Sequence, residues 1–192
     1  FRQTDPLFVI DFKDMKKPKI VGELKIPGFS SYLHPFNGYL VGIGTDGDAD
    51  RIGIYGWSYG GFMALGCALK GDGIFKMAIA VAPVTSWRYY DSIYTEIYNG
   101  LPSENPEGYD NNSPINFADR LSDKTRLLII HGTADDNVHL RNMIRYTHAL
   151  TQANKKFEMA IYPDSNHSIY YGRNTRYHLF EKIAEFFKAN LK

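Results

Sequence analysis

The sequence predicts an α/β fold: a mainly parallel sheet with helices on both faces, preceded by a short β-rich segment. Two observations indicate this. From about Asp48 onward, short apolar runs alternate with segments of helical periodicity, as in a parallel sheet with crossover helices. Before that point, short strand-like runs recur about every ten residues with no helical segment between them. We therefore expect two parts, a β-rich segment over residues 1–47 and an α/β domain over residues 48–192.

The β-rich segment consists of apolar runs separated by turn-forming residues. Strands are expected over residues 7–12, 20–26 and 39–44. The turn signals between them are Pro18, Pro27-Gly28 and Asn37-Gly38. This spacing is typical of one blade of a β-propeller, a fold that needs several such blades.

In the α/β domain, the hydrophobic pattern predicts each element in turn. Strands are expected over residues 51–55, 76–81, 126–130 and 157–162. Helices are expected over residues 60–69, 139–153 and 175–191. The last helix carries an apolar stripe that should pack on the sheet, made of Leu179, Phe180, Ile183, Ala184, Phe186 and Phe187. Between residues 83 and 122 lies a long insertion rich in aromatic residues, of a kind that tends to carry function.

Composition and charge exclude several classes of protein. Hydrophobic residues make up 44% and charged residues 22% of the chain, which is close to the globular average. The net charge of +1 comes from 22 basic and 21 acidic residues that are interleaved, so no nucleic-acid partner is expected. Cys67 is the single cysteine, which excludes an internal disulfide and a thiolate metal site. We expect no transmembrane segment, and we interpret a chain that starts at Phe1 as a piece of a longer or engineered polypeptide.

A nucleophile motif lies where the first α/β strand should turn into a helix. Gly56-Trp57-Ser58-Tyr59-Gly60 follows an apolar strand and opens a helix-like run. In Gly-x-Ser-x-Gly, the glycines allow a sharp turn that exposes the serine hydroxyl at the edge of an α/β-hydrolase sheet. The sequence therefore predicts Ser58 as the nucleophile of a serine hydrolase.

A serine nucleophile needs a base and an acid, and in this fold they follow it in the order acid, then histidine. Asp135 comes just after a predicted strand, and His167 lies in the loop after the next strand, so both should reach the edge that carries Ser58. Asp136 remains a rival for the acid because adjacent loop residues point in different directions. The other histidines are expected to be structural or solvated: His34, His131, His139, His148 and His178.

The chain resembles the prolyl oligopeptidase family of serine peptidases, and within it the dipeptidyl peptidase IV type found in bacteria. The resemblance covers residues 50–192. It is carried by the runs Gly56 to Gly61, Ala82-Pro83-Val84-Thr85-Ser86-Trp87-Arg88-Tyr89-Tyr90-Asp91-Ser92-Ile93-Tyr94-Thr95-Glu96, and His131-Gly132-Thr133-Ala134-Asp135-Asp136-Asn137-Val138-His139. The first 47 residues resemble part of a secreted prokaryotic β-propeller domain, notably at residues 5–11 and 26–35.

The resemblance implies a triad of Ser58, Asp135 and His167, with the Tyr59 amide donating to the oxyanion. It also implies a pocket for a proline or alanine side chain, and a residue that holds a substrate carbonyl. The pocket residues are Val84, Trp87, Tyr90, Tyr94 and Val138, and the carbonyl-binding residue is Asn137. A flat aromatic box suits a pyrrolidine ring, which offers area but no hydrogen-bond donor.

For the whole protein, the resemblance implies hydrolysis of peptide bonds after a penultimate Pro or Ala through an acyl-enzyme. It further implies homodimers, an extracytoplasmic location and no cofactor. Two positions depart from the family pattern, with Ile97 in place of Arg and Ser168 in place of Gly.

The family's first sheet strands, and a Tyr that completes its oxyanion hole, have no counterpart before residue 50, so the β-rich segment meets the hydrolase sequence near Gly47-Asp48. Two alternatives therefore stay open. One is a weak or inactive chimera that acts as a scaffold or binding protein. The other is a general serine esterase.

Overall fold

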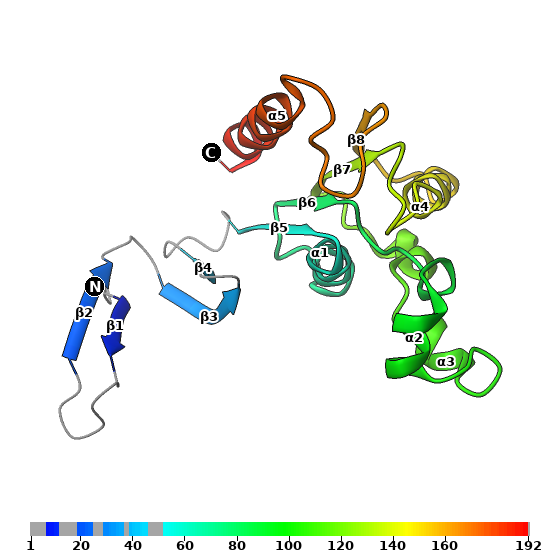
Figure 1. The fold of residues 1–192 in the computed structure, drawn as a ribbon, viewed down its shortest axis with the longest axis horizontal. Coiled ribbons are helices and arrows are strands. Elements are labelled where there is room, and N and C mark those ends of the chain that lie inside the picture. Colours follow the sequence, from blue (N-terminus) through cyan, green and yellow to red (C-terminus); the bar gives the residue numbers. More distant parts are fainter. Residues whose placement is uncertain (1–6, 12–18, 25–28, 37–38, 46–51, 192) are drawn as a thin grey trace. The chain divides into compact units, whose positions relative to one another are not determined.

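A computed structural model describes residues 7–11, 19–24, 29–36, 39–45 and 52–191 of the 192-residue chain. The chain divides into two compact units, Phe1–Ile52 and Gly53–Lys192. Figure 1 shows the ribbon of both units, each of which is described below by itself.

The described residues of the first unit that lie in strands form two antiparallel pairs. β1 (Leu7–Asp11) pairs with β2 (Lys19–Leu24), and β3 (Phe29–Phe36) pairs with β4 (Tyr39–Thr45). Both ladders contain a register shift, at Val9/Ile10 in the first pair and between Ser30 and Tyr32 in the second. The predicted turn residues and the junction near residues 47 and 48 lie outside the described residues.

The second unit alternates strands with helices. Its strands are β5 (Gly53–Trp57), β6 (Met77–Val81), β7 (Arg126–Gly132) and β8 (Glu158–Tyr162). Its α-helices are α1 (Tyr59–Lys70), α2 (Ser92–Asn99), α3 (Pro106–Asp110), α4 (Arg141–Gln152) and α5 (Thr175–Asn190). The 3₁₀ helices are η2 (Trp87–Tyr89) and η3 (Pro114–Arg120). The α/β fold class predicted from the sequence is confirmed.

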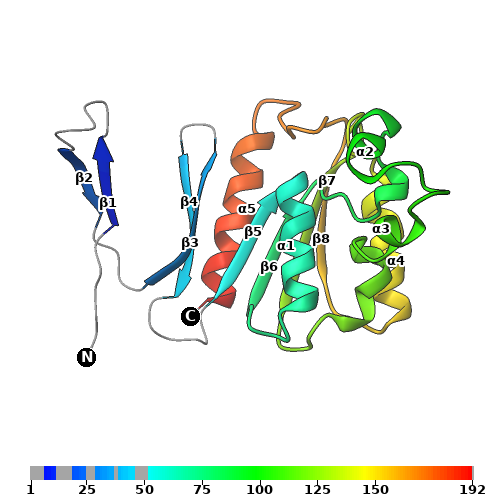
Figure 2. The same cartoon turned by 90° about the horizontal axis from the view of Figure 1, so that it is seen from below.

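The four strands form one parallel sheet in the order β5-β6-β7-β8. Apolar residues of β6 and β7 alternate between its two faces. One face packs against α1 and α4, which contribute Leu65, Met143 and Tyr146 to the core. The other face packs against α5 through Leu179 and Ile183. Figures 1 and 2 show α5 on one side of the sheet and α1 on the other.

The register of the sheet determines where the loops emerge. Trp57 pairs with Val81, Val81 pairs with Ile130, and Gly132 pairs with Tyr162, so the carboxyl ends of all four strands meet at one edge. Loops that leave these ends are therefore neighbours in space.

Three expectations about individual elements were incomplete or wrong. The strand β3 was not expected. The apolar stripe of the last helix is narrower than expected, because Phe180 and Ala184 are exposed while Leu179, Ile183 and Phe186 are buried. The Phe180 ring instead lies under the Arg176 guanidinium, 5.1 Å from its centroid. The insertion folds into η2, α2, α3 and η3.

No helix in the described part of the chain is long and apolar enough to cross a membrane.

Candidate active site

Ser58 lies in the turn between β5 and α1, at the carboxyl edge of the sheet. Its backbone has φ 59° and ψ −120°, a left-handed conformation that strains a residue with a Cβ. The turn is held at both ends, since the Ser58 amide donates to Val81 O at 2.8 Å and its carbonyl accepts from Phe62 N at 3.0 Å. A strained serine held in this way projects its side chain out of the turn.

Gly56 allows the turn to close. A Cβ at Gly56 would lie 1.9 Å from the carbonyl oxygen of Gly60 and 2.2 Å from its carbonyl carbon. These are backbone atoms of the first helical turn, so they cannot move aside without opening the turn. Close approach of the strand end to the helix start therefore requires glycine at position 56.

Asp135 follows β7 and faces the loop that carries His167. Its side chain has no exposed surface, and its Oδ2 lies 2.8 Å from His167 Nδ1. Its Oδ1 accepts hydrogen bonds from the amides of Asn137 at 3.1 Å and Val138 at 2.9 Å. The neighbouring Asp136 is exposed. The arrangement fixes the Asp135 carboxylate and leaves the other ring nitrogen of His167 available to a hydroxyl.

Burial and hydrogen bonding act on the Asp135 carboxyl in opposite directions. Burial by itself raises its pKa, but hydrogen bonds from His131 and His167 hold the pKa well below its usual range. Asp135 is therefore a carboxylate at neutral pH, which is the state that stabilises an imidazolium at His167.

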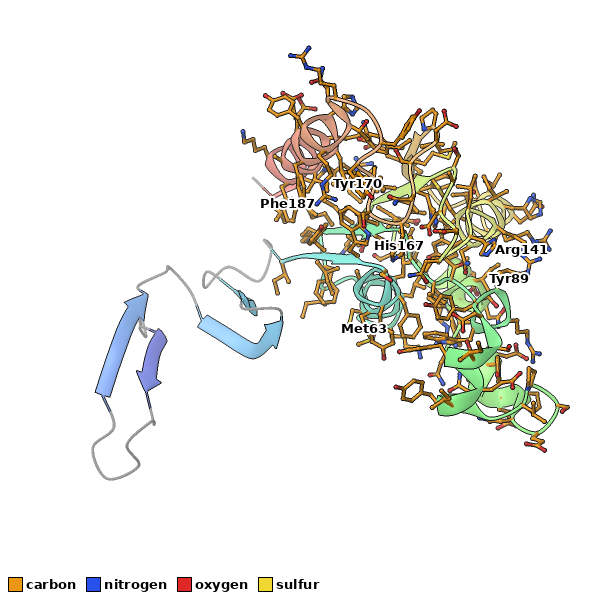
Figure 3. The ribbon with its side chains drawn as sticks, in the orientation of Figure 1. Met63, Tyr89, Arg141, His167, Tyr170 and Phe187 are labelled. Carbon is orange, nitrogen blue, oxygen red and sulfur yellow. The ribbon has the colours of Figure 1, made fainter. Side chains whose placement is uncertain are left out.

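The loop that carries His167 is tied to β5, the strand that leads into Ser58. Trp57 Nε1 donates to His167 O at 3.0 Å, and the Arg176 guanidinium lies over the Trp57 ring, 5.2 Å from its centroid. Arg176 also donates to Ser168 O. Figure 3 shows His167 and Tyr170 on this loop between β8 and α5. Within the described residues, no hydrogen bond joins the Ser58 hydroxyl to the His167 ring. Catalytic hydrogen bonds often form only once substrate binds.

A buried Ile169 anchors the same loop. It is fully buried against the core under α5, yet its φ is 47°, an unusual value for a β-branched residue. Ala82, at the end of β6, also has a positive φ of 44°. Backbone strain thus gathers beside Ser58 and His167, and strain of this kind persists only where the surrounding packing enforces it.

Aromatic side chains form a cluster beside the turn that holds Ser58. Trp87 stacks on Tyr94 with ring centroids 6.3 Å apart and meets Tyr90 edge-on at 6.1 Å. Val84 and Val138 are buried in contact with this group. The Tyr59 ring lies 6.1 Å from Trp87, which links the cluster to the residue after Ser58. The structure thus brings together the five residues expected to line the pocket.

Polar groups border the aromatic cluster. The Tyr90 hydroxyl donates to Asn137 Oδ1 at 2.8 Å. Its pKa is raised, first by burial and then by the negative charges of Asp91 and Asp135, so it remains a donor at neutral pH. This hydrogen bond orients the Asn137 side-chain amide and leaves its NH₂ group free to donate.

Two cavities adjoin the cluster. One of about 680 Å³ extends over α1 and includes Tyr59, Trp87 and Tyr94 in its wall. The other, of about 430 Å³, is lined by Tyr89, Tyr90, Asp91, Asp136, Asn137 and His139. Figure 3 shows Tyr89 beside Arg141, whose guanidinium lies 4.3 Å from the ring centroid. Only the second cavity includes Asn137, so it is the one that reaches the polar border of the cluster.

Comparison with known proteins identifies the family of the chain. A family model described as "Prolyl oligopeptidase family" matches residues 39–192, and one described as "Beta propeller domain" matches residues 1–64. The chain belongs to the prolyl oligopeptidase family. The expected propeller-like sequence at the N-terminal end is also confirmed.

Relatives in the prolyl oligopeptidase family are dipeptidyl peptidases by name. A probable dipeptidyl-aminopeptidase B of Paracoccidioides brasiliensis is 48% identical over 140 residues, which cover 72% of this chain and 15% of that protein. The crystal structure of Porphyromonas gingivalis dipeptidyl peptidase 4 matches with a TM-score of 0.72 at 55% identity, over 75% of this chain and 20% of that one.

A putative dipeptidyl aminopeptidase IV from Bacteroides ovatus matches with a TM-score of 0.71 at 40% identity, over the same shares of the two chains. The chain therefore spans 15% of the length of the curated relatives and 20% of the solved ones.

The two departures from the family pattern fall on the surface. Ile97 is 72% exposed on α2, and Ser168 is exposed beside His167. Ser168 is not among the residues with positive φ, so a side chain fits there without backbone strain. Its amide donates to Asn166 Oδ1 at 3.1 Å, which gives the loop a local tie.

One histidine expected to be structural or solvated proves to contact the site. His131 is fully buried near the end of β7, and its Nε2 lies 3.2 Å from Asp135 Oδ2. His139, His148 and His178 are exposed, while His34 lies where no side chain is described. The only signal in the sequence was the position of His131, directly after the predicted strand over residues 126–130 and four residues before Asp135.

Proposed function

We propose that this chain forms the catalytic part of a serine peptidase of the dipeptidyl peptidase IV type, which cleaves after a penultimate Pro or Ala. The observation that carries the proposal is the hydrogen bond of 2.8 Å between Asp135 and His167, on a loop tied through Trp57 to the strained turn of Ser58. No other buried carboxylate in the described part of the chain faces a histidine on that loop.

The proposed chemistry follows from the position of each group. Ser58 Oγ attacks the scissile carbonyl while His167 Nε2 takes its proton, and Asp135 holds the ring through Nδ1. The Tyr59 amide begins α1, where helix amides have no acceptor within the helix, and it donates to the oxyanion. His167 then returns the proton to the leaving amine, and water releases the acyl group by the reverse steps.

The aromatic cluster supports the choice of substrate. Trp87, Tyr90 and Tyr94 offer flat faces, and Val138 closes the base of the group. A pyrrolidine ring or a methyl group gains apolar contact there and needs no hydrogen-bond partner. The oriented Asn137 amide supplies the donor for the preceding substrate carbonyl.

The first test asks whether Ser58 is a nucleophile. A fluorophosphonate probe should label the 192-residue chain, and Ser58→Ala and His167→Ala should each abolish the labelling. Ser86→Ala is a matched control, because Ser86 is buried in the insertion and its hydroxyl accepts from Arg88 N at 3.3 Å. A folded chain that takes no label contradicts the proposal and supports a scaffold or binding role.

The second test addresses the substrate. Gly-Pro-nitroanilide should release nitroaniline, and Gly-Leu-nitroanilide should release far less because Leu does not fit the flat pocket. Tyr94→Leu should raise KM for the prolyl substrate while leaving probe labelling at Ser58 in place. Labelling accompanied by cleavage of short acyl esters, and not of prolyl amides, would instead identify an esterase.

A further inference from the structure

His131 is the one polar side chain in the buried part of β7. The residues before it, Leu127 to Ile130, are aliphatic and at most 2% exposed. His131 itself is fully buried, and its Nδ1 has no hydrogen-bond partner in the described part of the chain. An unpartnered buried polar atom costs stability, so packing alone does not account for a histidine here.

The contacts of the ring determine which nitrogen carries hydrogen. His131 Nε2 lies 2.7 Å from Val138 O and 3.2 Å from Asp135 Oδ2. Both oxygens can only accept, so the hydrogen is on Nε2. A hydrogen on Nδ1 would have no acceptor among the described residues, which favours the ring with a single hydrogen. His131 therefore shares one N–H between the carbonyl of Val138 and the carboxylate of Asp135.

These two acceptors are the two ends of one short turn. Asp135 Oδ1 accepts hydrogen bonds from the amides of Asn137 and Val138. The His131 Nε2–H donates to Val138 O, at the other end of the same turn. Asp135 Oδ2 receives His131 and His167 together, at 3.2 Å and 2.8 Å. Both oxygens of the carboxylate are thus held by donors, and rotation of the carboxylate away from His167 would also break its contact with His131.

We propose that His131 is a positioning residue: its Nε2–H holds Asp135 Oδ2 toward His167 and locks the turn that carries Asn137 and Val138. The proposal rests on the proposed function, since it assigns to one buried side chain the alignment of both the acid and part of the substrate pocket. The turn itself carries two carboxyl groups, those of Asp135 and the exposed Asp136. Among the described residues, three titratable side chains contact the turn: His131 and His167 at Asp135 Oδ2, and Tyr90 at Asn137 Oδ1.

The test compares a substitution that keeps a hydrogen-bond donor at position 131 with one that removes it. In His131→Gln, the terminal amide reaches about as far as Nε2 and can donate to the same oxygens. In His131→Leu, the volume is kept and the donor is lost. Ile129→Val, on the same strand and away from Asp135, serves as the control for a small loss of packing.

Proton NMR of the 192-residue chain gives the first readout, because a short hydrogen bond between His167 Nδ1–H and Asp135 produces a proton signal at very low field. The signal should be present in the parent chain, in His131→Gln and in Ile129→Val, and absent or broadened in His131→Leu. The rate of fluorophosphonate labelling should fall about tenfold to a hundredfold in His131→Leu and recover most of its value in His131→Gln.

The proposal is overturned if a folded His131→Leu keeps both the signal and the labelling rate. It is equally overturned if a folded His131→Gln loses as much as His131→Leu. Should His131→Leu fail to fold, His131→Asn takes its place, since its shorter amide does not reach both oxygens. A parent chain that shows the NMR signal but takes no label argues against the proposed peptidase function, while the signal series still decides the role of His131.

Discussion

The strained turn at Ser58 makes a quantitative prediction about stability. With φ 59° and ψ −120°, this residue occupies a region that glycine enters freely and other residues enter at a cost of about 1–3 kcal/mol. Ser58→Gly should remove that cost. The more flexible glycine also stabilises the unfolded state, by about 0.4–1 kcal/mol of added chain entropy, which offsets part of the gain. Ser58→Ala keeps the Cβ and therefore the strain. The Gly variant should be the more stable of the two by about 1 kcal/mol.

Urea or thermal unfolding of the two variants measures this difference. Both lack the hydroxyl, so the comparison isolates the backbone. For a chain of this size, about 1 kcal/mol corresponds to a rise in Tm of about 2–4 °C. If Ser58→Ala proves as stable as Ser58→Gly, the turn is not strained in solution, and the account of how Ser58 is held would be refuted.

Three further predictions concern the surroundings of Ser58. Gly56→Ala places a Cβ 1.9 Å from a backbone oxygen, so this variant should lose about 3 kcal/mol or more of stability and should no longer be labelled by the probe. Gly66→Ala is the control, because a Cβ there meets nothing within 4 Å, and it should keep both stability and labelling. Because the pKa of Asp135 lies below that of the unfolded chain, its carboxylate stabilises the fold above pH ~4, and this contribution is lost on acidification. Asp135→Asn should therefore lower stability at pH 7 and flatten its fall in acid, as pH-dependent denaturation would measure. Trp57→Phe removes the donor to His167 O, and it should slow labelling about tenfold or more with a loss of only about 1 kcal/mol in the unfolding free energy.

Periodicity in the sequence predicted most of the second unit, because its central strands β6 and β7 are buried on both faces and its helices are amphipathic. Each of the four strands and three long helices begins within about two residues of its expected start. β3 was missed because Phe29–Phe36 contains Ser30-Ser31 and Pro35, which weaken the strand signal, while pairing with β4 decides its conformation.

The candidate site shows where such reasoning ends. The order of Ser58, Asp135 and His167 along the chain, together with the parallel sheet, was enough to place them at one edge. Sequence could not separate Asp135 from Asp136, since the choice depends on which side chain turns inward after β7, and in the structure only Asp135 is buried against His167. The contact between His131 and Asp135 could not be predicted for a related reason. A histidine in an apolar strand gives the same sequence pattern whether its ring only packs or also donates a hydrogen bond.

The pocket illustrates a different limit. Trp87, Tyr90 and Tyr94 lie in a segment without regular periodicity, and only the turns of η2 and α2 bring their rings together. The N-cap of α2, where Asp91 accepts from Tyr94 N at 2.7 Å, sets the direction of that helix and so of the Tyr94 ring. The sequence shows only which residue types could form such local hydrogen bonds. The backbone conformation decides which of these bonds form.

The bond between Trp57 and His167 joins residues that are 110 positions apart in the chain. Contacts of such long range form late in folding, because both partners must first be carried to their places by β5, β8 and α5. The sheet can therefore reach its full secondary structure before the nucleophile and its base meet. In a refolding experiment, reactivity toward the fluorophosphonate probe would then appear after the circular dichroism signal of the helices. A chain with native helix content could still fail to react with the probe.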